Sequence, residues 1–204
     1  MPTRLPPVTR NLLIANVAVF LLQWLLPGLL DRCALWPLDS GYFGVWQIVT
    51  NAFMHANWEH LLFNMFALYM FGGAIETAFG SRHFTVYYFV CLAVASVLQL
   101  LVLKYFLHDA LTPTVGASGA IFGLLLAFGM LFPHEKLMLI FLPIPMPAWL
   151  FVAGYAAVEL FSGVTGLMPG VAHFAHLGGM LGGWVLIQYW RGRLPVKPRR
   201  RLLR

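Results

Sequence analysis

A serine and a histidine that are far apart in this sequence are the residue types that nucleophilic catalysis requires. Ser118 lies in the small-residue segment 116–120 (Gly-Ala-Ser-Gly-Ala), at the start of an apolar run that extends to Phe132. A serine hydroxyl is a weak nucleophile until a base accepts its proton, and histidine is the usual base near neutral pH. His176, within the sequence Ala-His-Leu-Gly-Gly over residues 175–179, is the natural partner. We therefore expect Ser118 to be the nucleophile and His176 to be its base.

A second group of polar residues has the spacing that an oxyanion hole needs. His60 and Asn64 are four residues apart and therefore project from the same face of a helix. A tetrahedral oxyanion requires donors that are fixed in advance, and the backbone amide of Ser118 at a helix N-terminus adds a third donor. We expect these three groups to form the oxyanion hole. Taken alone, Asn64 could instead bind a neighbouring backbone carbonyl, and a serine in a Gly/Ala-rich helix is most often a packing residue.

Two other catalytic motifs are excluded by spacing. His55 and His60 are five residues apart, whereas a zinc protease of the His-Glu-x-x-His type requires histidines at i and i+4. We therefore expect no metal and no cofactor, and we expect His55 to stabilise the junction between a loop and the next helix. Ala120 stands where the nucleophile elbow of the α/β-hydrolases has a glycine, and that motif also requires a preceding strand.

The composition indicates that membrane-spanning helices hold these residues. Of the 204 residues, 60% are hydrophobic and 10% are charged, and the mean hydropathy is +0.79, whereas soluble domains are about 25% charged. A helix needs about 20 apolar residues to cross a hydrocarbon core of about 30 Å. We predict an all-α, polytopic membrane protein that forms a single domain over residues 1–204. The six predicted spans cover residues 11–26, 58–79, 84–107, 118–132, 148–161 and 171–190.

The positions of the lysines and arginines predict which side each terminus faces, since short cytoplasmic loops are enriched in them. The tail over residues 191–204 is strongly basic, which places the C-terminus in the cytoplasm. An even number of spans then places the N-terminus there too, together with Arg4, Arg10, Arg82 and Lys136. Beside a span, such a tail contacts anionic lipid headgroups, so the net charge of +6 needs no nucleic-acid partner.

This topology brings polar residues of three spans to a common depth. The second, fourth and sixth spans all run from the outer to the inner side, and their first turns carry His60, Ser118 and His176. Polar side chains at membrane depth usually face a bundle interior or a water-filled cavity, so we expect one shared cavity that opens to the outer side. The fourth span has only 15 residues, or about 22 Å of helix, which recesses Ser118 below the membrane surface.

Several further residues have expected supporting roles. Gly179 and Gly183 form a small-xxx-small step that lets the sixth span approach a neighbouring helix closely. Glu76 and Glu159 are expected to form structural hydrogen bonds, because neither lies near the outer end of an even-numbered span. The aromatic segment 27–57 is expected to lie in the headgroup region and to pack on the bundle.

The ordered motifs resemble those of the rhomboid family of intramembrane serine proteases over most of the chain, from Trp46 to Gly183. The matching residues are His55, His60 and Asn64; Glu76 and Gly80; Gly116, Ser118 and Gly119; and Ala175, His176, Gly179 and Gly183. The resemblance implies a six-helix bundle and a dyad of Ser118 and His176 without a third, acidic member. It also implies hydrolysis of a peptide bond in or beside the transmembrane helix of a membrane-protein substrate, usually after a small residue.

The chain departs from the family pattern at two positions. Gln47 follows Trp46 where many bacterial relatives have arginine, so we expect a different anchoring of this loop to the headgroups. Phe122 stands where the family often has a tyrosine stacked on the catalytic histidine, so the ring is kept and the hydroxyl is lost. Neither change removes a reacting group.

These features together predict an intramembrane serine endopeptidase that acts through an acyl-enzyme in a bacterial inner (plasma) membrane. Substrate access is expected to depend on the outer loop and on the fifth span, which follows Pro143, Pro145 and Pro147 and ends near Ser162. The alternative is a non-catalytic polytopic protein, either a transporter or a pseudoprotease that binds substrates without cutting them. A transporter would predict internal repeats, and the sequence contains none.

Overall fold

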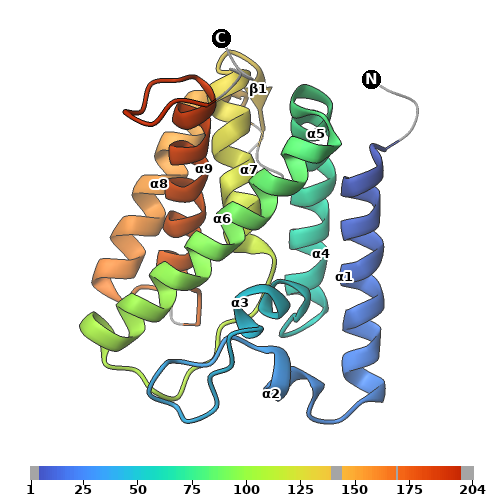
Figure 1. The fold of residues 1–204 in the computed structure, drawn as a ribbon, viewed down its shortest axis with the longest axis vertical. Helices are drawn as coiled ribbons and strands as arrows, with labels where there is room; N and C mark the ends of the chain where they lie inside the picture. The colour runs from blue at the N-terminus through green and yellow to red at the C-terminus, as the bar shows by residue number, and fades with distance from the viewer. Residues whose placement is uncertain (1–4, 139–143, 169, 199–204) are drawn as a thin grey trace.

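The fold consists of helices joined by short segments, with one two-stranded hairpin (Figure 1). The computed structural model describes residues 5–138, 144–168 and 170–198, so Arg4, Pro143 and the end of the basic tail lie outside the described residues. The elements are α1 (Pro7–Leu25), α2 (Leu29–Cys33), α3 (Gln47–Thr50), η1 (Asn51–Phe53), α4 (Trp58–Ala67), η2 (Leu68–Gly72), α5 (Gly73–Phe79), α6 (Ser81–Val102), η3 (Leu103–Leu107), α7 (Ser118–Leu131), β1 (Lys136–Leu137), β2 (Met146–Pro147), α8 (Ala148–Thr165) and α9 (His173–Trp190).

The all-α prediction is confirmed, and the helix ends that differ from the predicted spans have local causes. α1 begins at Pro7 rather than at residue 11, since proline is favoured in the first turn of a helix. The carboxylate of Glu76 also accepts hydrogen bonds from the first amides of α1, those of Val8 (3.0 Å) and Thr9 (2.7 Å). α8 continues past residue 161 to Thr165, where Gly166 (φ +71°) takes the left-handed conformation that ends many helices.

Four helical units among the described residues are long and apolar enough to cross a membrane. They cover Pro7–Leu25, Trp58–Phe79, Ser81–Leu107 and Ala148–Thr165. α7 is also apolar, but it has only 14 residues. The fold is therefore consistent with a multi-pass membrane protein, whereas the count of six spans stays a prediction.

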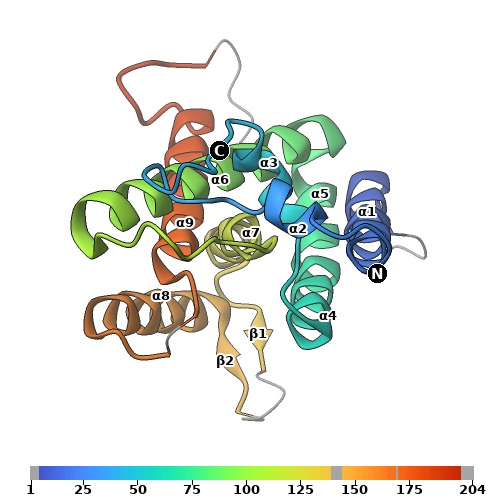
Figure 2. The same cartoon turned by 90° about the horizontal axis from the view of Figure 1, so that it is seen from below.

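α7 lies at the centre of the bundle, with α4, α6, α8 and α9 around it (Figure 2). Glycines allow α7 and α9 to approach closely, because a Cβ atom at Gly179 would overlap the backbone carbonyl of Gly119. Gly183 lies one turn further along α9, where an added Cβ would collide with the hydroxyl of Tyr87 on α6. The close approach predicted for the sixth span is thus observed, against α7 at Gly179 and against α6 at Gly183.

The two ends of the bundle hold different parts of the chain. α1 begins and α9 ends at one end, and α2 and α3 lie at the opposite end, where α7 also begins (Figure 1). Ser118 therefore lies at the end of the bundle that the segment before α4 covers.

The segment before α4 is stabilised from within by Gln47. This side chain is only 1% exposed. Its amide nitrogen donates to the carbonyl of Tyr42 (3.0 Å), and its oxygen accepts from the amide of Trp36 (3.1 Å). Gln47 therefore acts inside the loop, so its difference from arginine concerns loop packing. The neighbouring Trp46 is 58% exposed, as a residue at a headgroup interface would be.

Candidate active site

The structure brings Ser118 and His176 into hydrogen-bonding contact. Oγ of Ser118, the first residue of α7, lies 2.8 Å from Nε2 of His176 on the second turn of α9. The contact depends on the close approach of Gly119 and Gly179, which lie one and three residues beyond these side chains. His176 is buried, with 7% of its surface exposed. The arrangement allows a proton to pass directly from the hydroxyl to the imidazole.

Gly116 shapes the approach to Ser118. Its φ of +115° is a conformation that residues with side chains rarely adopt, and its amide donates to the carbonyl of Asn51 (2.9 Å). A Cβ atom here would lie 2.6 Å from Nε2 of His60 and 3.8 Å from Oγ of Ser118. The His60 imidazole therefore lies beside the open face of Gly116, close to the nucleophile.

The side chain of Asn64 is turned back toward its own helix. Asn57 begins α4 by accepting a hydrogen bond from the amide of His60 (2.8 Å), which is a normal N-cap. The amide nitrogen of Asn64 donates to the carbonyl of His60 (2.8 Å). Asn64 thus makes the backbone contact that the sequence left open as an alternative, although it also lines the same cavity as His60 and Ser118.

His55 is placed in a structural position. Its backbone exchanges two hydrogen bonds of 3.0 Å with the side chain of Gln23 on α1, and its ring packs edge-on against Phe20 and His60. Burial, together with the charge that His60 can carry, lowers the pKa of His55 to about 4. The ring is therefore neutral at ordinary pH, which suits a residue that holds α1 against the start of α4.

Phe122 covers one face of the base. Its ring lies parallel to that of His176, with centroids 4.1 Å apart and an angle of 7° between the planes. The edge of the same ring contacts Tyr155 on α8. Loss of the family's usual hydroxyl has left the stacking geometry intact, so Phe122 restricts how the imidazole can turn.

Glu159 and His173 were not assigned to this site by the sequence analysis. Oε2 of Glu159 on α8 lies 2.7 Å from Nδ1 of His173 and 2.9 Å from Nδ1 of His176. The signal that was available is the direction of the helices: Glu159 is in the second half of α8, which ends at the same end of the bundle where α9 begins (Figure 1). The searched, described residues contain no cluster of three or more His, Cys, Asp or Glu that could hold a metal ion.

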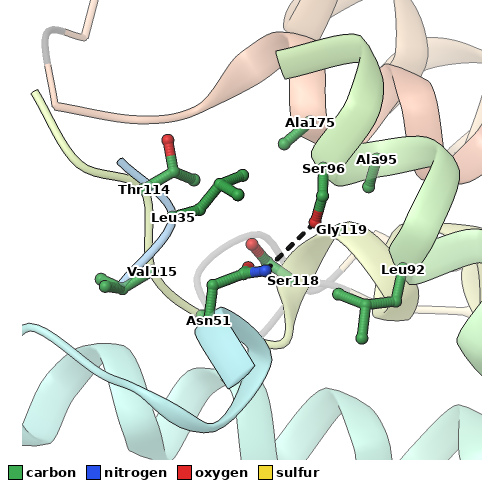
Figure 3. Close-up of a pocket in the computed structure, with 11 residues that line it drawn as sticks. Leu35, Asn51, Leu92, Ala95, Ser96, Thr114, Val115, Ser118, Gly119 and Ala175 are labelled. Carbon is green, nitrogen blue, oxygen red and sulfur yellow. Dashed lines mark hydrogen bonds between the residues drawn. The ribbon is translucent and has the colours of Figure 1, made fainter. Parts of the chain in front are cut away.

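Asn51 is a third residue that the sequence did not assign to this site. Its amide nitrogen donates to the carbonyls of Gln47 (2.6 Å) and Ile48 (3.0 Å), and it lies 3.1 Å from Oγ of Ser96 on α6. Figure 3 shows this contact beside a small cavity that Ser118 and Gly119 also line. The cavity measures about 10 Å³, roughly the space of one water molecule. Because its backbone carbonyl also accepts from the amide of Gly116, Asn51 joins the segment before α4 to the turn that precedes Ser118.

A larger cavity of about 780 Å³ lies in front of the serine. Its lining comes from α4, α6, α8, α9 and the segment that leads into α7, and it includes His60, Asn64, Ser118 and His176. The expected convergence of three helix starts on one cavity is observed. Its volume suits a short stretch of polypeptide.

Comparison with known proteins relates this chain to one family. A family model described as "Rhomboid domain" matches residues 42–193. The chain is similar to "Rhomboid protein 1, mitochondrial" of Saccharomyces cerevisiae, with 35% identity over 97% of this chain and 60% of the relative. It is also similar to "Rhomboid protease GlpG" of Klebsiella pneumoniae (34% identity over 58% of this chain and 41% of the relative) and to "Presenilin-associated rhomboid-like protein, mitochondrial" of Bos taurus (30% over 91% and 50%). The chain spans about half the length of these relatives.

Proposed function

The chain belongs to the rhomboid family, and from this premise we propose that it is an intramembrane serine protease with Ser118 as nucleophile and His176 as base. One observation carries the proposal, the distance of 2.8 Å between Oγ of Ser118 and Nε2 of His176. The pair lines a cavity of about 780 Å³, which leaves room for the backbone of a substrate. A packing serine would need neither the imidazole nor the cavity.

The proposed reaction proceeds through an acyl-enzyme. Oγ of Ser118 attacks the scissile carbonyl carbon while Nε2 of His176 takes the hydroxyl proton. When the peptide C–N bond breaks, the same nitrogen gives that proton to the leaving amine. His176 then takes a proton from water, which attacks the ester carbonyl. The bond between Oγ and the acyl carbon breaks, and Nε2 of His176 returns the proton to Oγ, which releases the second product and restores the serine.

The oxyanion of each tetrahedral intermediate needs donors near Ser118. The amide of Ser118 is in the first turn of α7, where helical amides have no partner within the helix, and no side chain caps that turn. Nε2 of His60 lies beside Gly116, and we assign it as the second donor to the oxyanion. We assign Asn64 as the third donor, and its amide has to turn away from the His60 carbonyl to reach the oxyanion. One such donor typically contributes on the order of 10²- to 10³-fold in rate.

The proposed substrate is a membrane protein whose transmembrane helix unwinds at a small residue. Large apolar side chains such as Leu25 on α1 and Phe161 on α8 are exposed, as expected for helices in contact with lipid.

We propose that both ends of the chain face the cytoplasm, so that the cavity opens to the outer side. The relatives include mitochondrial and bacterial proteins, so the inner-membrane location rests on the sequence argument alone.

Reconstitution with a labile single-span substrate tests the proposal. Ser118→Ala and His176→Ala are each expected to abolish cleavage, because each removes a reacting group. A fluorophosphonate probe is expected to label the wild type but not Ser118→Ala.

Ser162→Ala is the matched control for these variants. Ser162 is also buried and lines the same cavity, but it lies on α8. This variant is expected to cleave and to be labelled like the wild type. Cleavage that survives Ser118→Ala would rule out the assigned nucleophile, and a wild type that binds the substrate without cutting it would favour the pseudoprotease alternative.

A further inference from the structure

A buried carboxylate lies between two imidazoles at the back of the proposed dyad. The side chains of Glu159, His173 and His176 are each less than a tenth exposed. Glu159 comes from α8, an otherwise apolar helix, and a carboxylate in such a place is costly unless it is paired. Oε2 of this one residue lies within 3 Å of Nδ1 of both histidines. Its position therefore requires an explanation in terms of what it binds.

The ring nitrogens of His176 have distinct tasks. Nε2 faces the serine hydroxyl at 2.8 Å and must be free of a proton to act as the base. In the neutral ring the proton is then on Nδ1, which lies 2.9 Å from Oε2 of Glu159. The N–H direction falls outside hydrogen-bond geometry in this conformation, and no other described group bonds to Nδ1. A carboxylate at this position favours the tautomer that catalysis needs.

His173 holds the carboxylate in place. Its Nδ1 bonds to Oε2 of Glu159 at 2.7 Å, and its Nε2 lies 3.1 Å from the carbonyl oxygen of Leu167. A carbonyl can only accept, so Nε2 carries a proton. The contact between Nδ1 of His173 and Oε2 of Glu159 holds a second proton. With both ring nitrogens protonated, His173 is the cation that balances the charge of Glu159. The carboxylate is thereby held beside His176 rather than free to rotate into the cavity.

We propose that Glu159 is a positioning residue for His176, and that His173 fixes Glu159, so that the dyad works as part of a chain of four groups. This inference rests on the proposed function. In acylation the proton leaves Oγ of Ser118 for Nε2 of His176, the bond from Oγ to the scissile carbon forms, and the carboxylate stabilises the imidazolium without taking its proton. The proton then leaves with the amine.

The arrangement ties the base to α8. Ser118 is on α7 and His176 is on α9, whereas Glu159 is supplied by α8, which buries few of its side chains. The chain of groups is complete only while the second half of α8 lies against α9. A displacement of α8 that carried Glu159 away would leave His176 without its partner, so the position of this helix governs the base as well as the width of the cavity.

Substitutions that change one charge at a time test the proposal. The titratable groups that face His176 are Glu159 from α8, His60 from α4 and His173 from α9 itself. Glu159→Gln is expected to lower kcat on the order of 10²-fold with little change in KM. This is less than the roughly 10⁴-fold loss when a triad carboxylate becomes an amide, because the contact to Nδ1 is imperfectly aligned. Glu159→Asp, which keeps the charge, is expected to recover part of the rate.

The pH dependence of kcat/KM separates positioning from a merely structural role. Glu159→Gln removes a negative charge that favours the imidazolium, so the acidic limb of the profile is expected to move to lower pH. His173→Gln removes the balancing positive charge, so the limb is expected to move to higher pH. Loss of folding would reduce the rate without shifting the limb in opposite directions.

The outcomes of the proposed function and of this inference are distinguishable. Wild-type cleavage that is lost in Ser118→Ala supports the function and provides the reference rate. If Glu159→Gln then retains the wild-type kcat and profile, the inference is wrong while the function stands. If Glu159→Gln fails to fold, His173→Gln decides, because an acidic limb that stays at the wild-type pH in this variant would overturn the inference.

Discussion

Gly116 meets two requirements at once, an unusual backbone conformation and space for a neighbouring side chain. Its φ of +115° turns the chain into the start of α7, and the missing side chain leaves room for the His60 imidazole beside Ser118. Either demand alone would favour glycine. A glycine at this position therefore allows His60, a proposed oxyanion donor, to lie close to Ser118.

Replacement of Gly116 by alanine is expected to lower kcat/KM on the order of 10²-fold, as the loss of one oxyanion donor does. The added Cβ would lie 2.6 Å from Nε2 of His60 and would displace that ring. Gly41→Ala is the matched control, because Gly41 has a similar positive φ of +78° with nothing within 4 Å of an added Cβ. Steady-state kinetics of both variants provide the measurement. Equal losses in the two would assign the effect to backbone strain alone.

The pair of helices α7 and α9 sets the distance between nucleophile and base. Ser118 and His176 are separated by a long stretch of sequence, and their contact depends on how closely the two backbones approach at Gly119 and Gly179. A backbone carbonyl cannot rotate away from an added methyl group as a side chain can. Packing at this crossing is therefore directly coupled to catalysis.

Gly179→Ala is expected to reduce the free energy of unfolding by about 3 kcal/mol, at the upper end of overpacking costs, and to abolish cleavage. The new methyl group would overlap the carbonyl of Gly119 and push the helices apart. Thermal unfolding in detergent and cleavage per folded molecule measure the two effects. Gly154→Ala, a helical glycine with open space around it, should change neither. A fully active Gly179→Ala would show that the crossing tolerates more separation than the structure indicates.

The sequence predicted the helices and the contact of Ser118 with His176 better than it predicted the other groups around His176. Long apolar runs and breakers define where helices lie. Ser118, His60 and His176 line one cavity because each lies near the start of its helix. Glu159 could not be predicted from the starts of helices, because it lies near the end of α8 and meets His176 only where α8 packs against α9. Asn51 could not be predicted because the contact that links it to α6, to Oγ of Ser96, joins segments that are distant in sequence.

The helices that surround the cavity differ in how many of their side chains are buried. α4 and α8 both line the cavity, and α9 closes it behind. α9 buries residues along its whole length, whereas α8 buries only Ala148, Val152, Glu159 and Ser162 and exposes large apolar side chains. An element with few buried contacts opens at the lowest free-energy cost. α8 is therefore the helix that we expect to move when a transmembrane substrate enters.

A cross-link between the start of α4 and the end of α8, which both line the cavity, is expected to block cleavage of a transmembrane substrate. Ala56, two residues before α4, and Leu167, two residues after α8, both line the cavity. Each can be replaced by cysteine in a chain whose half-buried Cys33 has been changed to serine. A bis-maleimide then joins the two sites. The small fluorophosphonate probe should still label Ser118, since the dyad is not altered, whereas the substrate helix can no longer pass.

A monofunctional maleimide on both cysteines is the control and should leave most cleavage intact. Unchanged turnover of the transmembrane substrate after cross-linking would show that entry does not require these helices to separate.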